Sequence, residues 1–138
     1  MGNIKAFMLP PVEEETKEVI ISDRFKEGDK VVPFVIRVIS QETNEAIRNR
    51  ASHPIRRNGT TVGMDFDTDL YGKLLLQECV AFPNFKDEEL CKFYKTHDPL
   101  EVPGRMLRAG EYGKLIKEIN ILNGFTEDKT VLEDEAKN

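Results

Sequence analysis

The residues with the clearest potential for chemistry are three aspartates at alternating positions, Asp65, Asp67 and Asp69, in the stretch MDFDTDLYG. Carboxylates at this spacing bind metal ions in calcium loops and open some phosphotransfer sites. An EF-hand calcium loop requires Gly at its sixth position and Glu at its twelfth, where this sequence has Leu70 and Leu76. A phosphotransfer site requires a buried strand before the first carboxylate, and TTVGM is a poor one. The spacing therefore argues against a metal site.

The alternative for the same stretch is a helix start. Asp67 or Thr68 is positioned to cap a helix, and Asp69 would then lie near the positive end of the helix dipole. We expect this structural role. The less favoured alternative is an enzyme or regulator that binds a metal ion through the three aspartates.

Few other residues have types that could support catalysis or metal binding. Cys79 and Cys91 lie in segments with helical patterns, and neither they nor His53 and His97 have the paired spacing of a zinc site. The sequence contains no nucleophile motif and no glycine-rich phosphate loop. We therefore expect no enzymatic activity, no cofactor and no metal, with both cysteines reduced and buried.

A basic run, RNRASHPIRRNG, contains Arg56 and Arg57 immediately before an Asn-Gly turn. Such a run suits phosphates or an acidic protein surface. Aromatic residues for base stacking are not interleaved, and the whole chain has a net charge of −5. Apolar runs all fall short of the roughly 18–20 residues of a membrane span. We expect a protein partner rather than nucleic acid or membrane, and a soluble cytoplasmic protein without an export signal.

The elements that position these residues follow from periodicity and from capping residues. The sequence predicts two paired strands, a helix capped by Ser40, a hairpin turning at Asn58-Gly59, and four further helical segments. In the second strand Pro33 marks an edge or the first turn, because proline lacks a backbone N–H. The expected strands are at 18–22 and 31–39, and the expected helices are at 41–51, 67–82, 87–95 and 110–122. Another helical segment starts at Asp98-Pro99, and the last helix ends before Gly124. In the helix at 87–95, Leu90, Phe93 and Tyr94 are expected to point inward.

This order predicts an α+β fold, in which a small antiparallel sheet and hairpins in the N-terminal half are packed by four to five mostly C-terminal helices. Residues 1–125 would form a single domain, with residues 1–16 as an extended arm. Residues 126–138 are acidic and have little to bury, so we expect them to be disordered.

Two apolar features have no obvious cover in this fold. Phe7, Met8 and Leu9 form an apolar segment in the arm FMLPPV, and Ile121 points away from the inward stripe of the last helix. Together they predict exposed apolar surface that a partner or a second protomer covers. With Arg56 and Arg57, these are the candidate partner-binding residues.

Taken as a whole, residues 6–125 resemble a known family. The resemblance rests on SDRF followed by VPFVIR, on DTDLYGKLLL with its continuation FPNFKDEEL, and on LRAGEYGKLIKEINILNGF. These segments are similar to the XkdN-like tail assembly chaperones of long-tailed phages and prophages of Gram-positive bacteria. None of them is a catalytic signature.

The resemblance implies a non-enzymatic protein of the bacterial host cytoplasm. It would bind the tape measure protein while the tail tube assembles, with the tail tube protein as a second candidate partner, and would be absent from the mature virion. It also implies that a frameshifted, longer form is made in many such phages. A structural tail component that stays in the virion is the alternative.

Overall fold

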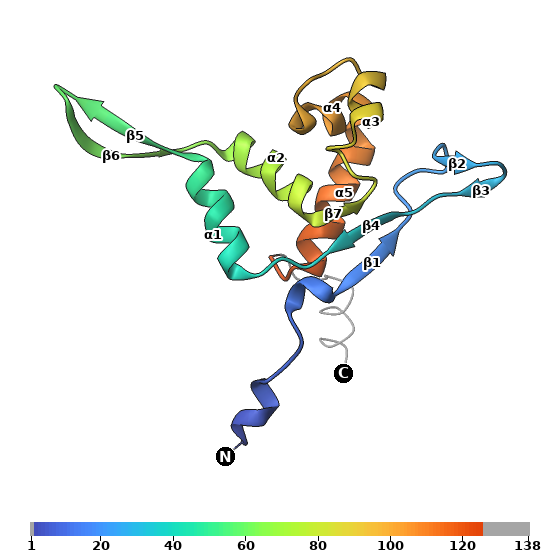
Figure 1. Cartoon of the computed structure of the whole chain (residues 1–138), viewed down its shortest axis with the longest axis horizontal. Coiled ribbons are helices and arrows are strands. Elements are labelled where there is room, and N and C mark those ends of the chain that lie inside the picture. The colour runs from blue at the N-terminus through green and yellow to red at the C-terminus, as the bar shows by residue number, and fades with distance from the viewer. Residues whose placement is uncertain (1, 126–138) are drawn as a thin grey trace, which may run out of the picture.

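The computed structural model describes residues 2–125, so the predicted disorder of residues 126–138 lies outside the described part of the chain. A three-stranded antiparallel sheet forms the centre of the molecule (Figure 1). Its strand order is β1–β4–β7, with β4 in the middle. The strands span Thr16–Val19 (β1), Phe34–Arg37 (β4) and Val80–Phe82 (β7).

The first two strands of this sheet pair as a hairpin, as predicted, but both are shorter than the sequence suggests. The predicted strand at 31–39 is divided, because Pro33 has no N–H to donate and separates β3 from β4. A small outlying hairpin, with strands Lys26–Glu27 (β2) and Lys30–Val31 (β3), fills the connection. On the inward face of β4, Phe34 and Ile36 are buried.

Five α-helices lie in the described residues, and the first two begin at capping residues that the sequence indicates. The Ser40 hydroxyl accepts a hydrogen bond from the Thr43 N–H at 3.2 Å, and Asp87 and Asp98 cap in the same way. The helices span Gln41–Arg50 (α1), Thr68–Cys79 (α2), Glu88–Phe93 (α3), Val102–Met106 (α4) and Ala109–Leu122 (α5), with a 3₁₀ turn at Pro99–Glu101 before α4. The predicted α+β fold is confirmed.

The prediction of one helix over 67–82 is wrong at its C-terminal end. The helix stops at Cys79, and Val80 turns to an extended conformation and pairs with Ile36 of β4. Pairing with a strand more than forty residues earlier in the chain overrides the helical periodicity that continues through Phe82.

The core lies between the sheet and helices α2 and α5. Leu74 and Leu76 of α2 and Leu115 and Ile119 of α5 are almost completely buried together with Ile36. Both cysteines are free and buried, as predicted, and burial raises the pKa of the Cys79 thiol to about 12. Such a thiol stays protonated and unreactive near neutral pH.

Polar contacts fasten the two ends of α5. At its start, the Glu111 carboxylate accepts hydrogen bonds from the guanidinium of Arg24, at 2.6 to 3.2 Å, and from the Arg108 N–H at 2.8 Å. At its end, the Asn123 amide accepts a hydrogen bond from the Ile39 N–H at 2.8 Å and donates one to the Arg37 carbonyl at 3.2 Å. These contacts join α5 to the connection that follows β1 and to the end of β4.

The helix α5 terminates at Gly124, as the sequence indicates. Gly124 has a φ of +77°, and its N–H donates to the Ile121 carbonyl at 3.1 Å. The Phe125 N–H donates to the Asn120 carbonyl at 2.9 Å, which completes a Schellman motif. The carbonyls of Asn120 and Ile121, near the end of the helix, therefore have partners.

Candidate functional site

A long β-hairpin projects from the body of the protein between α1 and α2 (Figure 1). Its strands are Ser52–Arg57 (β5) and Thr60–Phe66 (β6), joined by the predicted turn, in which Asn58 and Gly59 both have positive φ. A β-bulge interrupts the pairing between Ile55 and Arg56. Strands of this length extend about 20 Å at roughly 3.3 Å per residue.

The base of this hairpin is firmly attached. The Arg48 guanidinium lies over the Phe66 ring at 4.8 Å, and Phe66 packs against Tyr71 with ring centroids 5.5 Å apart. The Asp67 N–H donates to the Ala51 carbonyl at 2.8 Å, which links the two ends of the hairpin. The hairpin is thus oriented by α1 and α2 even though it leaves the core.

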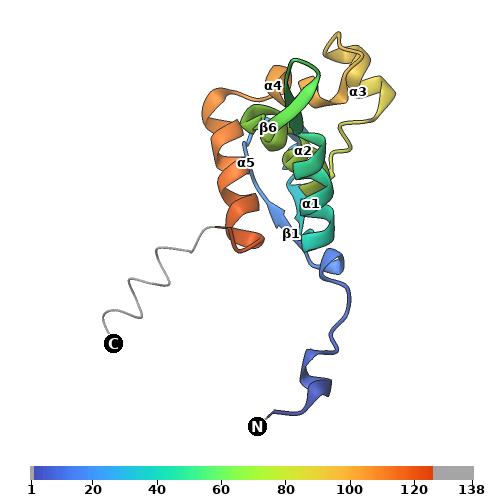
Figure 2. The same cartoon turned by 90° about the vertical axis from the view of Figure 1, so that its left-hand side faces the viewer.

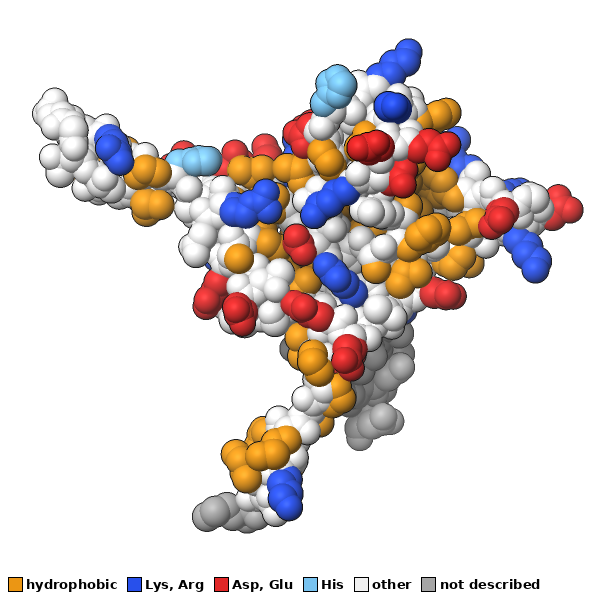
Figure 3. All heavy atoms as spheres, in the orientation of Figure 1, with side chains coloured by type: hydrophobic (Ala, Val, Ile, Leu, Met, Phe, Trp, Pro, Cys, Tyr) orange, Lys and Arg blue, Asp and Glu red, His pale blue; other side chains and the backbone are white. Residues whose placement is uncertain are grey.

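Beyond its base the hairpin exposes apolar side chains to solvent. Met64 is 62% exposed and lies two residues from Phe66, so both side chains are on the same face. Figure 3 shows hydrophobic side chains along the stem of this projection. Its exposed large apolar residues are Ile55, Val62, Met64 and Phe66.

The predicted basic residues lie at the far end of the same hairpin. Arg56 and Arg57 adjoin the turn, and both are exposed. Within residues 2–125 neither forms an ion pair. The hairpin therefore combines an apolar stem with an uncompensated positive tip, on a chain whose net charge is −5.

The second projection is the N-terminal arm. It contains two short 3₁₀ turns, Ile4–Phe7 (η1) and Val12–Glu14 (η2), rather than a fully extended segment. Phe7, Met8 and Leu9 are 70 to 78% exposed. Figures 1 and 2 show the arm leaving the body at the end away from the β5–β6 hairpin. The structure therefore does not bring the arm and the basic tip together.

The remaining candidate, Ile121, is half-buried on α5 instead of fully exposed. The exposure expected at this position is therefore only partial. Ile121 is consequently the least accessible of the predicted partner-binding residues.

The three aspartates do not converge on one point. Asp67 caps α2, accepting a hydrogen bond from the Leu70 N–H at 3.0 Å, which confirms the predicted helix start. Asp65 pairs with His53 across the hairpin, and Asp69 lies in the first turn of α2. No group of three or more His, Cys, Asp or Glu side chains in the described range is placed to hold a metal ion.

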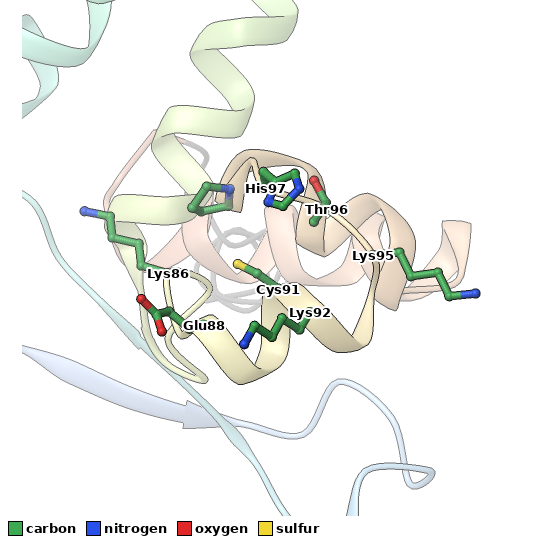
Figure 4. Close-up of a pocket in the computed structure, with 8 residues that line it drawn as sticks. Lys86, Glu88, Cys91, Lys92, Lys95, Thr96 and His97 are labelled. Carbon is green, nitrogen blue, oxygen red and sulfur yellow. The ribbon is translucent and has the colours of Figure 1, made fainter.

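A wide hollow of about 620 Å³ lies beside α3 (Figure 4). The side chains of Lys86, Lys92 and Lys95 point in different directions around it. The Cys91 thiol donates to the Phe85 carbonyl at 3.3 Å and is buried. The lining residues thus present no convergent set of charges for a small anionic ligand.

Comparisons with known proteins identify the family of this chain. A family model described as "Phage XkdN-like tail assembly chaperone protein" matches residues 4–137. The chain belongs to this family. No described helix has both the length and the apolar character needed to cross a membrane.

Two proteins of Bacillus subtilis (strain 168) are similar over nearly the whole chain. The uncharacterized protein YqbN is 36% identical, covering 96% of this chain and 92% of YqbN. The phage-like element PBSX protein XkdN is 33% identical, covering 96% of this chain and 93% of XkdN. A crystal structure of YqbN superposes with a TM-score of 0.71 at 29% identity, covering 88% of this chain and 96% of the crystallised chain.

Sequence reasoning missed the apolar stem of the hairpin. The signal was present in TTVGMDF, where Val62, Met64 and Phe66 alternate with small or polar residues. Alternation identifies a strand with one apolar face, but it does not reveal whether another element covers that face.

The expected orientation of Phe93 is wrong: it was expected to point inward and is 75% exposed. It lies 200° around α3 from buried Cys91, at 100° per residue.

Proposed function

We propose that this protein is a non-enzymatic tail assembly chaperone that binds the tape measure protein during tail assembly, with the tail tube protein as a second candidate partner. It would act in the cytoplasm of the bacterial host and be absent from the mature virion. Membership of the tail assembly chaperone family supports the general role. The observation that carries the proposal is the β5–β6 hairpin, an anchored projection with an exposed apolar stem.

The chemistry of the hairpin suits an amphipathic helix with acidic residues beside its apolar stripe. The stem offers Val62 and Met64 for apolar contact, and the tip offers Arg56 and Arg57 for charge pairing. The arm residues Phe7, Met8 and Leu9, and to a lesser extent Ile121, are candidates for further contacts. Apolar burial would supply affinity, while the arginines would steer the encounter.

Co-expression with overlapping fragments of the tape measure protein tests this proposal. We expect the wild-type chain to keep at least one fragment soluble, and Met64→Asp to lower the soluble amount. Asn49→Asp, a matched charge on the exposed side of α1, should have no effect. Leu9→Asp and Ile121→Asp then measure the contribution of the arm and of α5.

Two outcomes would contradict the proposal. If folded hairpin, arm and α5 variants all solubilise the fragments as well as wild type, these surfaces are not the binding site. If wild type solubilises no fragment, binding of the tape measure protein loses its support. Detection of the chain in purified particles would instead favour a structural tail component.

Salt dependence tests the role of the basic tip separately. Charge steering predicts that the association rate falls as ionic strength rises, because salt screens exposed charges. Replacing Arg56 and Arg57 with Gln should flatten this dependence. An unchanged salt response in the double variant would show that the tip does not guide the encounter.

A further inference from the structure

An apolar groove lies on the body at the edge of the central sheet, away from the β5–β6 hairpin. Its volume is about 210 Å³, and it is bordered by β4, β7, α3 and the connection after β3. Figure 3 shows hydrophobic side chains gathered there, beside the β2–β3 hairpin. Four aromatic rings and two prolines contribute to its lining: Phe25, Phe34, Phe82, Tyr94, Pro33 and Pro83.

This groove is open to solvent in the monomer. Phe82 at its edge is 53% exposed. Grooves lined by aromatic rings bind extended, proline-containing apolar segments, because such segments lose little conformational entropy on binding. The fitting occupant is therefore short, apolar and proline-containing.

The arm of this chain has that composition. Phe7, Met8 and Leu9 are followed directly by Pro10 and Pro11, and all three apolar side chains are solvent-exposed. They have no packing partner within their own described chain that buries them. The groove and the arm are thus complementary apolar surfaces on one polypeptide.

Charged residues indicate how the arm would be oriented in the groove. The segment 2–12 contains Lys5 and no acidic residue. A shallow hollow that shares Leu90 with the groove is lined by Asp87 and Glu89 at the start of α3. An arm lying in the groove can place Lys5 near these carboxylates, which would fix its orientation.

The arm leaves the body away from the groove of its own chain (Figure 1). The Glu13 carboxylate accepts a hydrogen bond from the Thr43 hydroxyl at 2.8 Å, and this bond lowers the pKa of Glu13. The Val38 N–H donates to the Glu15 carbonyl at 3.0 Å. Residues 13–15 are thereby fastened at the α1 end of β4, whereas the groove lies at the Phe34 end of that strand.

We propose that the arm of one copy occupies the aromatic groove of a second copy, and that a reciprocal exchange of arms forms a symmetric dimer. A twofold dimer of this kind contains two identical arm–groove contacts. The inference requires only this chain and stands independently of the tape measure protein.

Sedimentation velocity of the full chain over a range of concentrations tests the dimer. We expect wild type to sediment as a dimer, and both the double variant Phe7→Asp/Leu9→Asp and the variant Phe82→Asp to sediment as monomers. Val62→Asp places the same charge on an exposed apolar site of the hairpin and should remain dimeric.

Mixing the two monomeric variants gives a more specific test. The arm variant retains an intact groove, and the groove variant retains an intact arm, so together they can form one contact. We expect a heterodimer in the mixture, although neither variant self-associates. A wild-type chain that is monomeric throughout, a dimer that survives both variants, or a dimer lost only in Val62→Asp would each overturn the proposal.

A peptide probe keeps the test valid if Phe82→Asp does not fold. A labelled peptide with the sequence of residues 2–12 is titrated onto the full-length Phe7→Asp/Leu9→Asp chain. We expect saturable binding that weakens about tenfold or more when Phe82 is replaced by Ala. No binding would overturn the proposal. Since this measurement contains no tape measure protein, its failure is distinct from failure of the proposed function.

Discussion

The central sheet and the β5–β6 hairpin are both antiparallel, and the hairpin has the longer strands, with six and seven residues against three or four. The sheet nevertheless contains residues such as Ile36, which is 0% exposed, whereas no residue of the hairpin strands is buried. Strand length and pairing therefore do not determine which region contributes to the core. A region contributes to the core when helices α2 and α5 cover it.

This difference in burial assigns the central sheet to stability and the hairpin to recognition of a partner. A side chain in the sheet stabilises the fold by leaving water, at about 25 cal/mol per Å² of apolar surface. An apolar side chain on the hairpin remains exposed to water, so its surface is available to contact a partner. Substitutions in the two regions should consequently affect different measurements.

The largest expected effect is on stability, from a truncation in the sheet. Phe34→Ala removes a buried ring and should lower the free energy of unfolding by about 3–5 kcal/mol. Urea unfolding followed by circular dichroism measures this loss. The matched truncation Met64→Ala in the hairpin should cost far less, and equal losses would contradict the separation of the two regions.

An intermediate effect is expected from the Arg24–Glu111 pair, which stabilises the body and has no counterpart among the described residues of the hairpin. The hydrogen bond from Arg24 lowers the pKa of Glu111 from 4.5 to about 2. A lowered carboxyl pKa stabilises the folded state above its ordinary value, and this contribution is lost as the pH falls toward about 2.

Glu111→Gln should therefore lower the melting temperature near neutral pH and converge on wild type in strong acid. Thermal unfolding across this pH range measures the difference. Glu27→Gln, on the exposed strand β2, is the control. A difference that persists unchanged into strong acid would show that ionised Glu111 is not the stabilising species.

A smaller effect is expected where the hairpin joins the body. Asp67→Ala removes the cap of α2 and should cost about 0.5–2 kcal/mol, while Asp67→Asn retains an accepting oxygen and should cost less. Chemical unfolding distinguishes the two variants. Stoichiometric divalent-metal binding that either change abolished would instead revive a metal role for the aspartates.

The smallest stability effect is expected on the stem of the hairpin. Val62→Ser should change the free energy of unfolding by less than about 0.5 kcal/mol, because the side chain is largely exposed. Its binding to tape measure fragments should nevertheless fall. A large stability loss would mean that the hairpin contributes to folding as well as to recognition.

Local signals in the sequence predicted local structure well. The caps at Ser40 and Asp67, the Asn58-Gly59 turn and the glycine stop of α5 all follow from contacts within a few residues. These features depend on the chemistry of one side chain and the nearest backbone groups.

Features that depend on distant segments were missed. The strand β7 exists because Val80 pairs with Ile36, a residue more than forty positions earlier in the chain. Likewise, the exposure of the hairpin stem and the aromatic groove reflects the absence of a covering element in the described residues, which no local pattern encodes.

The end of α5 also provides an attachment point for other polypeptides. Because the Schellman motif at Gly124 and the Asn123 bonds fix the helix end within the described residues, we expect a chain that is joined beyond Phe125 to leave these bonds in place. A fluorescent protein or an affinity handle joined there should leave the β5–β6 hairpin accessible. The same geometry would let a single domain carry C-terminal extensions of different lengths.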